Sequence, residues 1–192
     1  MARVHCDCNQ RVRFTGKVTS LGQLRDWYCC NCHSLPKMLG RFKKLELDKA
    51  IHDAAAALCE HGRMYSHQRR NGHAVCKWAA DLLLKQRTKI KACKSFEDLV
   101  AIVKRCTRLI PRFKELSVYD TALRIGANLD IFPDRVYLHC GAKAGARNLQ
   151  LKIGKGYLEK SDLPIELRQL PPHIIENFFC VCKKQLRQLR VA

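Results

Sequence analysis

Apolar residues recur at helical spacing from about residue 45 to the end of the chain. Leu47, Ile51, Ala55 and Leu58 stand four, four and three residues apart, which places them on one face of a helix. Similar apolar faces recur in later segments: 64–87, 95–110, 117–132, 142–151 and 171–189. The pattern therefore predicts a mainly α fold, with an all-helical domain over residues 41–192.

Two Ser-x-x-Asp sequences mark the expected starts of two of these helices. Ser95 precedes Asp98, and Ser117 precedes Asp120, by three residues. In this arrangement the serine oxygen accepts a hydrogen bond from a first-turn amide, and the acid accepts one from the amide of the cap residue. We expect helices to begin at both serines, and we expect Pro111 to end the first one.

The first 40 residues follow a different pattern. They contain five cysteines, an alternation of polar and apolar residues in RVRFTGKV, and turn residues at Gly16, Gly22 and Pro36. Short runs of alternating residues between turn signals favour strands over helices. The sequence therefore predicts a small β lobe over residues 1–40, joined to the helical domain by the link GRFKK.

The cysteines of this lobe have the spacing of a zinc site. Cys6 and Cys8 form one pair, Cys29 and Cys32 form another, and twenty residues separate the pairs. Four thiolates from two facing turns can surround a tetrahedral Zn²⁺. The layout resembles the zinc-ribbon class over about residues 4–36, and the resemblance implies a structural Zn²⁺ held by these four cysteines.

Alternatives to this ligand set stay open. Cys30, His5 or His33 can replace one of the thiolates, because each lies beside a candidate ligand. The same cysteines are also consistent with reduced or redox-active thiols, or with small buried packing residues. A site with four protein ligands leaves no open position for a substrate, so zinc here is expected to be structural.

The charge of the chain points to a polyanionic partner. Lys and Arg total 36 against 17 Asp and Glu, a formal net charge of +19. Such an excess repels itself in a compact fold, and nucleic acid is the first partner expected, before an anionic membrane surface. A basic surface kept for solubility is the alternative. The candidate phosphate-binding residues are Arg69, Arg70, Lys77, Arg105, Arg108, Arg112, Arg124, Lys143 and Arg147.

Residues 109–150 join two predicted helices through a short basic turn. The segments 109–111 and 121–124 are similar to the helix-hairpin-helix segment of the DNA glycosylase superfamily. The resemblance implies that backbone amides of the hairpin contact a DNA phosphate, and it carries a catalytic aspartate onto Asp120. Helix capping is the alternative role for this residue. Residues 112–115 (RFKE) occupy the turn where that family has glycines.

The stretch HCGAKAGARN has two interpretations. Gly141 and Gly145 allow another helix to approach closely, with Lys143 and Arg147 left in solvent. Alternatively, the helix N-terminus and these two cations, four residues apart, hold a phosphate.

Three functions are compatible with the sequence. The leading hypothesis is a non-catalytic, zinc-stabilised nucleic-acid-binding protein with DNA preferred to RNA. The alternatives are a glycosylase-like or other nucleic-acid-processing enzyme, and a protein-interaction or host-targeting factor that docks on an acidic partner. No Walker loop, dinucleotide fingerprint or HExxH sequence occurs.

The expected location is a reducing intracellular compartment, either cytoplasm or nucleoid or nucleus. The first ten residues, MARVHCDCNQ, lack the apolar stretch of a secretory signal. No run reaches the roughly 18 apolar residues of a membrane span. Clustered cysteines in a reducing compartment favour metal or redox chemistry over disulfides.

Overall fold

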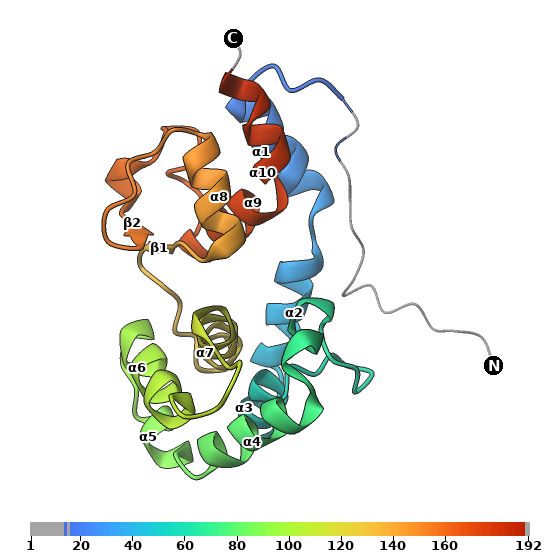
Figure 1. Cartoon of the computed structure of the whole chain (residues 1–192), viewed down its shortest axis with the longest axis vertical. Coiled ribbons are helices and arrows are strands. Elements are labelled where there is room, and N and C mark those ends of the chain that lie inside the picture. Colours follow the sequence, from blue (N-terminus) through green and yellow to red (C-terminus); the bar gives the residue numbers. More distant parts are fainter. Residues whose placement is uncertain (1–13, 15, 191–192) are drawn as a thin grey trace, which may run out of the picture. The chain divides into compact units, whose positions relative to one another are not determined.

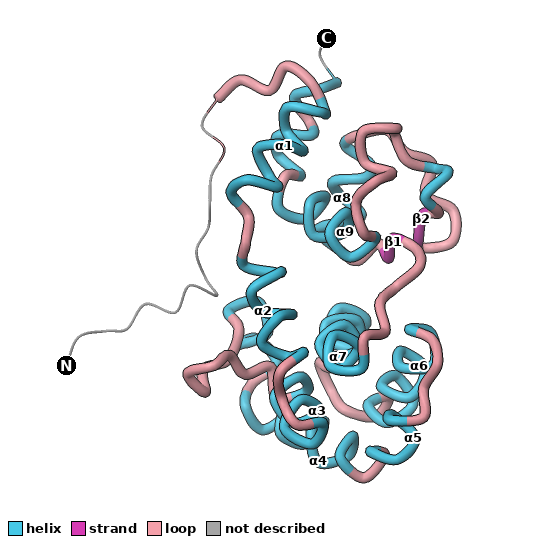
Figure 2. The backbone as a smooth tube through the Cα atoms, turned by 180° about the vertical axis from the view of Figure 1, so that it is seen from behind, coloured by secondary structure: helices cyan, strands magenta, loops and turns pink. Residues whose placement is uncertain are grey.

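The structure is a computed structural model that describes residues 14 and 16–190 of the chain. Its contacts divide these residues into two compact units. One unit comprises residues 36–132, and the other comprises residues 133–190 together with residue 14 and residues 16–35. The chain therefore passes from one unit to the other at two places, near residue 35 and near residue 132 (Figures 1 and 2).

The described residues form ten α-helices, three short 3₁₀ helices and one two-stranded sheet, so the prediction of a mainly α fold is confirmed. The α-helices are α1 (Leu21–Asn31), α2 (Ser34–Lys43), α3 (Leu47–Ala55), α4 (His73–Leu84), α5 (Arg87–Lys91), α6 (Phe96–Thr107), α7 (Glu115–Leu129), α8 (Cys140–Asn148), α9 (Pro172–Val181) and α10 (Lys183–Leu186). The other elements are β1 (Val136–Tyr137), β2 (Tyr157–Leu158), η2 (Ser66–Asn71), η3 (Lys160–Asp162) and η4 (Gln188–Arg190).

Helices α1 and α2 occupy residues for which the sequence analysis expects short strands and little helix, so that expectation is wrong for this segment. Ser20 caps α1, because its Oγ accepts a hydrogen bond from the amide of Gln23 at 3.1 Å. Leu24 and Tyr28 are both buried and stand four residues apart, which gives α1 an apolar face at helical spacing. Cysteine spacing favoured a turn-rich lobe, but the cap and the apolar face favour a helix.

The zinc-ribbon-like β lobe is not confirmed. Of the predicted strand RVRF at residues 11–14, only Phe14 lies within the described residues. Residues 16–19 form no strand. The link GRFKK, predicted as a connection between domains, lies largely inside α2.

The division into two units also differs from the boundary predicted near residue 40. Residues 16–35 group with residues 133–190 rather than standing alone. The rings of Tyr28 and Phe178 meet edge to face with centroids 5.3 Å apart. Asn177 Nδ2 donates a hydrogen bond to the hydroxyl oxygen of Tyr28 at 2.6 Å. The apolar face of α1 is therefore covered by α9, from the far end of the chain.

In the unit 36–132, the long helix α7 is packed between α3 and α6 (Figure 1). Along α7, ten of the eleven residues from Ser117 to Ala127 are buried, and the remaining one, Asp120, is half-buried. A helix that is apolar almost all round is a core helix. Helix α4 packs on α3 and α6 and completes the bundle.

One of the two predicted capping boxes is present. Ser95 Oγ accepts from the amide of Asp98 at 3.1 Å, and Asp98 Oδ2 accepts from the amide of Ser95 at 3.1 Å, so α6 starts as predicted. The second prediction is wrong, because α7 starts two residues before Ser117, with Lys114 as its N-cap. Ser117 is buried inside the helix, where its hydroxyl accepts a hydrogen bond from Asn71 Nδ2 at 2.8 Å.

The helix predicted from about residue 45 ends earlier than expected. Helix α3 stops at Ala55, and Ala57 adopts a left-handed backbone conformation with φ of 56°. The chain then forms a tight loop in which Leu58 and Met64 pair as an isolated antiparallel bridge. Gly62 occupies this loop with φ of 68°.

The core of the second unit lies between α1, α8, α9 and the small sheet. Strands β1 and β2 are antiparallel, with Val136 opposite Leu158. Helices α8 and α9 pack closely, as Figure 1 shows. A Cβ atom added to Gly145 would lie 2.7 Å from the carbonyl carbon of Phe179, so only glycine allows this approach. The small residues of α8 therefore serve helix packing.

Candidate nucleic-acid interface

The nine predicted phosphate-binding residues fall on several elements. Arg69 and Arg70 lie in η2, Lys77 in α4, and the rest follow: Arg105 in α6, Arg108 at its C-cap, Arg112 in the turn before α7, Arg124 in α7, and Lys143 and Arg147 in α8. Seven of the nine are exposed, Lys143 is half-buried, and Arg124 is buried. Lys143 and Arg147 belong to the unit that contains α8 and α9.

The largest concentration of cations is the basic segment, residues 85–114, which runs from the end of α4 through α5 and α6 to the start of α7. It contains ten basic residues and two acidic ones, Glu97 and Asp98. All ten basic side chains are exposed: Lys85, Arg87, Lys89, Lys91, Lys94, Lys104, Arg105, Arg108, Arg112 and Lys114.

Acidic partners neutralise little of this charge. Arg87 forms an ion pair with Asp48. The other nine cations of the basic segment form no ion pair with any described residue. Asp98 is engaged in the capping box of α6. The basic segment therefore presents a strong positive potential to solvent.

Two cations of this segment lie around one thiol. Burial raises the pKa of Cys106, and the charges of Arg105 and Lys89 oppose that rise. Lys89 belongs to α5 and Arg105 to α6, so the positive charges of two helices act on this thiol.

Arg124 does not belong to this interface, and the prediction is corrected for this residue. It is 1% exposed, and its Nη1 donates a hydrogen bond to the carbonyl oxygen of Ala54 at 3.1 Å. Its guanidinium carbon lies 4.6 Å from the centroid of the Tyr65 ring. The available signal was the run from Thr121 to Leu129, in which Arg124 is the one charged residue, because a helix that is apolar all round is buried.

Asp120, the predicted catalytic aspartate, makes contacts that hold η2 against α7. Its carboxylate accepts a hydrogen bond from Gln68 Nε2 at 2.7 Å and lies 3.8 Å from Arg124 Nη2. The Asn71–Ser117 hydrogen bond lies along the same two elements. These contacts join η2 to α7, so Asp120 acts as a link between helices rather than as the first-turn cap that its spacing from Ser117 indicated.

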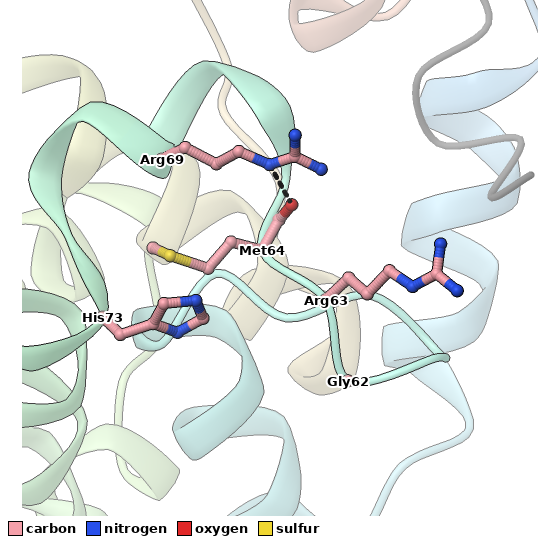
Figure 3. Close-up of a pocket in the computed structure, with 5 residues that line it drawn as sticks. All are labelled: Gly62, Arg63, Met64, Arg69 and His73. Carbon is pink, nitrogen blue, oxygen red and sulfur yellow. Dashed lines mark hydrogen bonds between the residues drawn. The ribbon is translucent and has the colours of Figure 1, made fainter. Parts of the chain in front are cut away.

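A surface pocket of about 480 Å³ lies beside the start of α4 (Figure 3). It is lined by Gly62, Arg63, Met64, Arg69 and His73. Arg69 Nε donates a hydrogen bond to the carbonyl oxygen of Met64 at 3.4 Å. The sequence predicted Arg69 as a phosphate-binding residue but not Arg63, which lies in the loop after α3.

Half of the predicted zinc ligands can be located. Cys6 and Cys8 lie outside the described residues. Cys29 is exposed in α1, and Cys32 is buried at its C-cap. Burial raises the pKa of both thiols, and the charge of Cys29 adds to the rise at Cys32, so the two thiols are neighbours.

Cys29 and Cys32 supply at most two of the four ligands that a tetrahedral zinc site needs. No group of three or more His, Cys, Asp or Glu side chains is placed to hold a metal ion within residues 14 and 16–190. Of the alternatives, Cys30 is exposed, and His33 Nε2 donates a hydrogen bond to the carbonyl oxygen of Cys30 at 2.8 Å. A zinc site therefore needs ligands from Cys6, Cys8 or the alternative His5, which all lie outside the described residues.

Comparisons of the chain with protein-family models, curated proteins and solved structures found no match. In the part of the chain that the structure describes, no helix has both the length and the apolar character needed to cross a bilayer.

Proposed function

We propose that the protein binds nucleic acid, DNA in preference to RNA, without catalysing a reaction on it. The observation that carries this proposal is the basic segment, in which ten cations are exposed and, among the residues that the structure describes, only Arg87 is paired with an acid. Each Lys or Arg that neutralises a phosphate releases condensed counterions, which is a large favourable term in binding.

Trp78 is a candidate residue for contacts with bases. Trp78 is 48% exposed on α4, next to Lys77. An exposed aromatic ring beside a cation offers a stacking surface for an unpaired base. This combination supports nucleic acid over an acidic protein as the partner.

The non-catalytic part of the proposal concerns Asp120. The glycosylase resemblance needs this carboxylate to act on a substrate. Its hydrogen bond from Gln68 and its proximity to Arg124 instead support a role in holding η2 against α7. An enzyme would lose product formation and keep binding in the Asp120→Asn variant, and product formed by the wild type on damaged or abasic DNA would contradict our proposal.

Structural Zn²⁺ remains part of the proposal, with Cys6, Cys8, Cys29 and Cys32 as its ligands. When bound, zinc would hold the thiols as thiolates and fix the N-terminal segment to α1. Elemental analysis of purified protein should find one zinc per chain, and the Cys6→Ser variant should lose it. Zinc-free wild-type protein would remove zinc from the proposal and leave the basic segment unaffected.

Binding is tested by fluorescence anisotropy with labelled duplex DNA over a range of salt concentrations. The logarithm of the affinity should fall linearly with the logarithm of the salt concentration, by about one unit of slope per phosphate contact. A variant with Lys104→Gln, Arg105→Gln and Arg108→Gln should lower that slope by about three.

Lys43→Gln is the matched control, because Lys43 is exposed in the same unit but lies 3.0 Å from Asp130. Its slope should stay close to that of the wild type. Affinity that does not change with salt would contradict the proposal. Duplex RNA of the same sequence tests the preference for DNA, and stoichiometric capture of an acidic protein with no affinity for either nucleic acid would favour the docking alternative.

A further inference from the structure

The pocket beside α4 has walls set by the backbone. Gly62 and Gly72 have φ of 68° and 85°, a backbone conformation that residues with a side chain rarely adopt. The loop that contains Gly62 is held by the Leu58–Met64 bridge and by a hydrogen bond from the amide of Cys59 to the carbonyl oxygen of Arg63 at 2.8 Å. The side chains that line the pocket therefore start from fixed positions.

All the titratable side chains that line the pocket are basic or imidazole groups: Arg63, Arg69 and His73. Figure 3 shows the two guanidinium groups extending to the same side of Met64, with His73 on the other side. The acid nearest in sequence, Glu60, lies 3.5 Å from the imidazole of His61. The pocket thus combines positive charge with no acidic lining residue.

The start of α4 adds to this potential. Its N-cap is Gly72, which has no side chain to cap the first turn, and the first turn contains no acidic residue. Uncapped amides at a helix N-terminus carry partial positive charge and favour anions. His73, the first residue of α4, brings this end of the helix to the pocket.

From these features we propose that the pocket binds a terminal phosphate monoester of a nucleic-acid strand. The inference rests on the proposed function and deepens it. A monoester carries about −1.5 to −2 charges at neutral pH, whereas a phosphodiester within the chain carries one. Two guanidinium groups on one side of the pocket match the larger charge, and arginine suits phosphate because its planar fork donates two parallel hydrogen bonds.

The size of the pocket agrees with a strand end. A volume of about 480 Å³ lies within the roughly 300–1,000 Å³ of small-ligand sites, which is room for a phosphate and part of its nucleoside.

The experiment compares labelled oligonucleotides of one sequence that carry a 5′-phosphate, a 3′-phosphate or hydroxyls at both ends. Anisotropy titrations at one salt concentration should give about tenfold tighter binding for one phosphorylated end, the size expected for a charge-assisted hydrogen-bond pair. The two phosphorylated arms tell which strand end the pocket accepts.

Arg69→Gln should abolish this preference. Arg70→Gln is the matched control: Arg70 is the exposed neighbour of Arg69 in η2, and it does not line the pocket. This control should weaken binding of all three oligonucleotides alike and keep the preference. Thermal melts followed by circular dichroism should show that both variants are folded.

Equal wild-type affinity for all three oligonucleotides would overturn the terminal-phosphate inference and leave the proposed function standing. A preference that survives in Arg69→Gln would also overturn it. Absence of binding to any of the three would overturn both.

Discussion

Charged side chains in this protein have different roles according to their burial. Asp53 is 2% exposed, and it forms ion pairs with Arg41 and with Lys49, the latter at 3.3 Å. Burial alone would raise the pKa of Asp53, but hydrogen bonds from His52 and Arg41 and the nearby positive charges outweigh it and hold the pKa below its usual value. These charges stabilise the fold and are not available to a partner.

Arg124 and Arg105 provide a direct comparison of the two roles. Arg124→Ala should lower the free energy of unfolding by about 3 kcal/mol, because it leaves the Ala54 carbonyl and Asp120 without their cation in the core. Arg105→Ala should leave stability within about 0.5 kcal/mol of the wild type and weaken DNA binding instead. Urea unfolding measures the change in stability, and anisotropy measures the change in DNA binding. A larger loss of stability in Arg105→Ala than in Arg124→Ala would contradict these two roles.

His173 is a buried base whose protonation is unfavourable in the folded state. Burial lowers the pKa of His173 from 6.5 to about 4. The unfolded chain therefore binds a proton between these pH values when the folded chain does not, and stability is lost as the pH falls through this range.

The free energy of unfolding should consequently fall by about 3 kcal/mol more between pH 7 and pH 4 in the wild type than in His173→Gln. The measurement is urea unfolding at a series of pH values. Subtracting the variant removes the contribution of the carboxylates that both proteins share. Parallel pH profiles for the two proteins would show that His173 titrates normally.

At the scale of elements, the closest approach is that of α8 and α9. A Cβ on Gly145 would meet the backbone of Phe179, with its Cα at 2.9 Å, and backbone atoms cannot rotate away as a side chain can. Gly145→Ala should therefore destabilise the protein by about 1–3 kcal/mol, the usual cost of overpacking.

Gly154→Ala is the control for this substitution, because no atom lies within 4 Å of the position of its added Cβ. Its melting temperature should match that of the wild type. Equal melting temperatures for Gly145→Ala and Gly154→Ala would contradict the close approach of α8 to α9 at Gly145.

Elements with strong local signals were predictable, and those that depend on distant partners were not. The start of α6 was predicted because Ser95 and Asp98 lie three residues apart, within the first turn of one helix. Helix α1 was missed because its cysteines were given more weight than the spacing of Leu24 and Tyr28. Ser117 had the same local sequence as a cap, but its contact with Asn71, 46 residues away, placed it inside α7.

At the scale of the whole molecule, the net charge of +19 predicts that salt has opposite effects on stability and on DNA binding. Raising the ionic strength from about 0.01 M to about 0.15 M shortens the Debye length from about 30 to about 8 Å, which screens repulsion between the cations. The melting temperature of the free protein should rise over this range while its affinity for DNA falls.

Differential scanning fluorimetry and anisotropy in the same buffers measure these trends. A melting temperature that falls with salt would mean that attractive ion pairs, such as Arg41 with Asp53, outweigh the repulsion between unpaired cations.

By itself, the sequence determined the mainly helical character of the fold, the start of α6, and the large excess of positive charge. These properties depend on spacing within a few residues or on composition. Only the tertiary structure decided that α1 packs with α9, that Arg124 is buried while Arg105 is exposed, and that Arg63, Arg69 and His73 line one pocket. The reason is physical: a helix forms through contacts four residues apart, whereas burial and convergence depend on partners that lie up to 150 residues away.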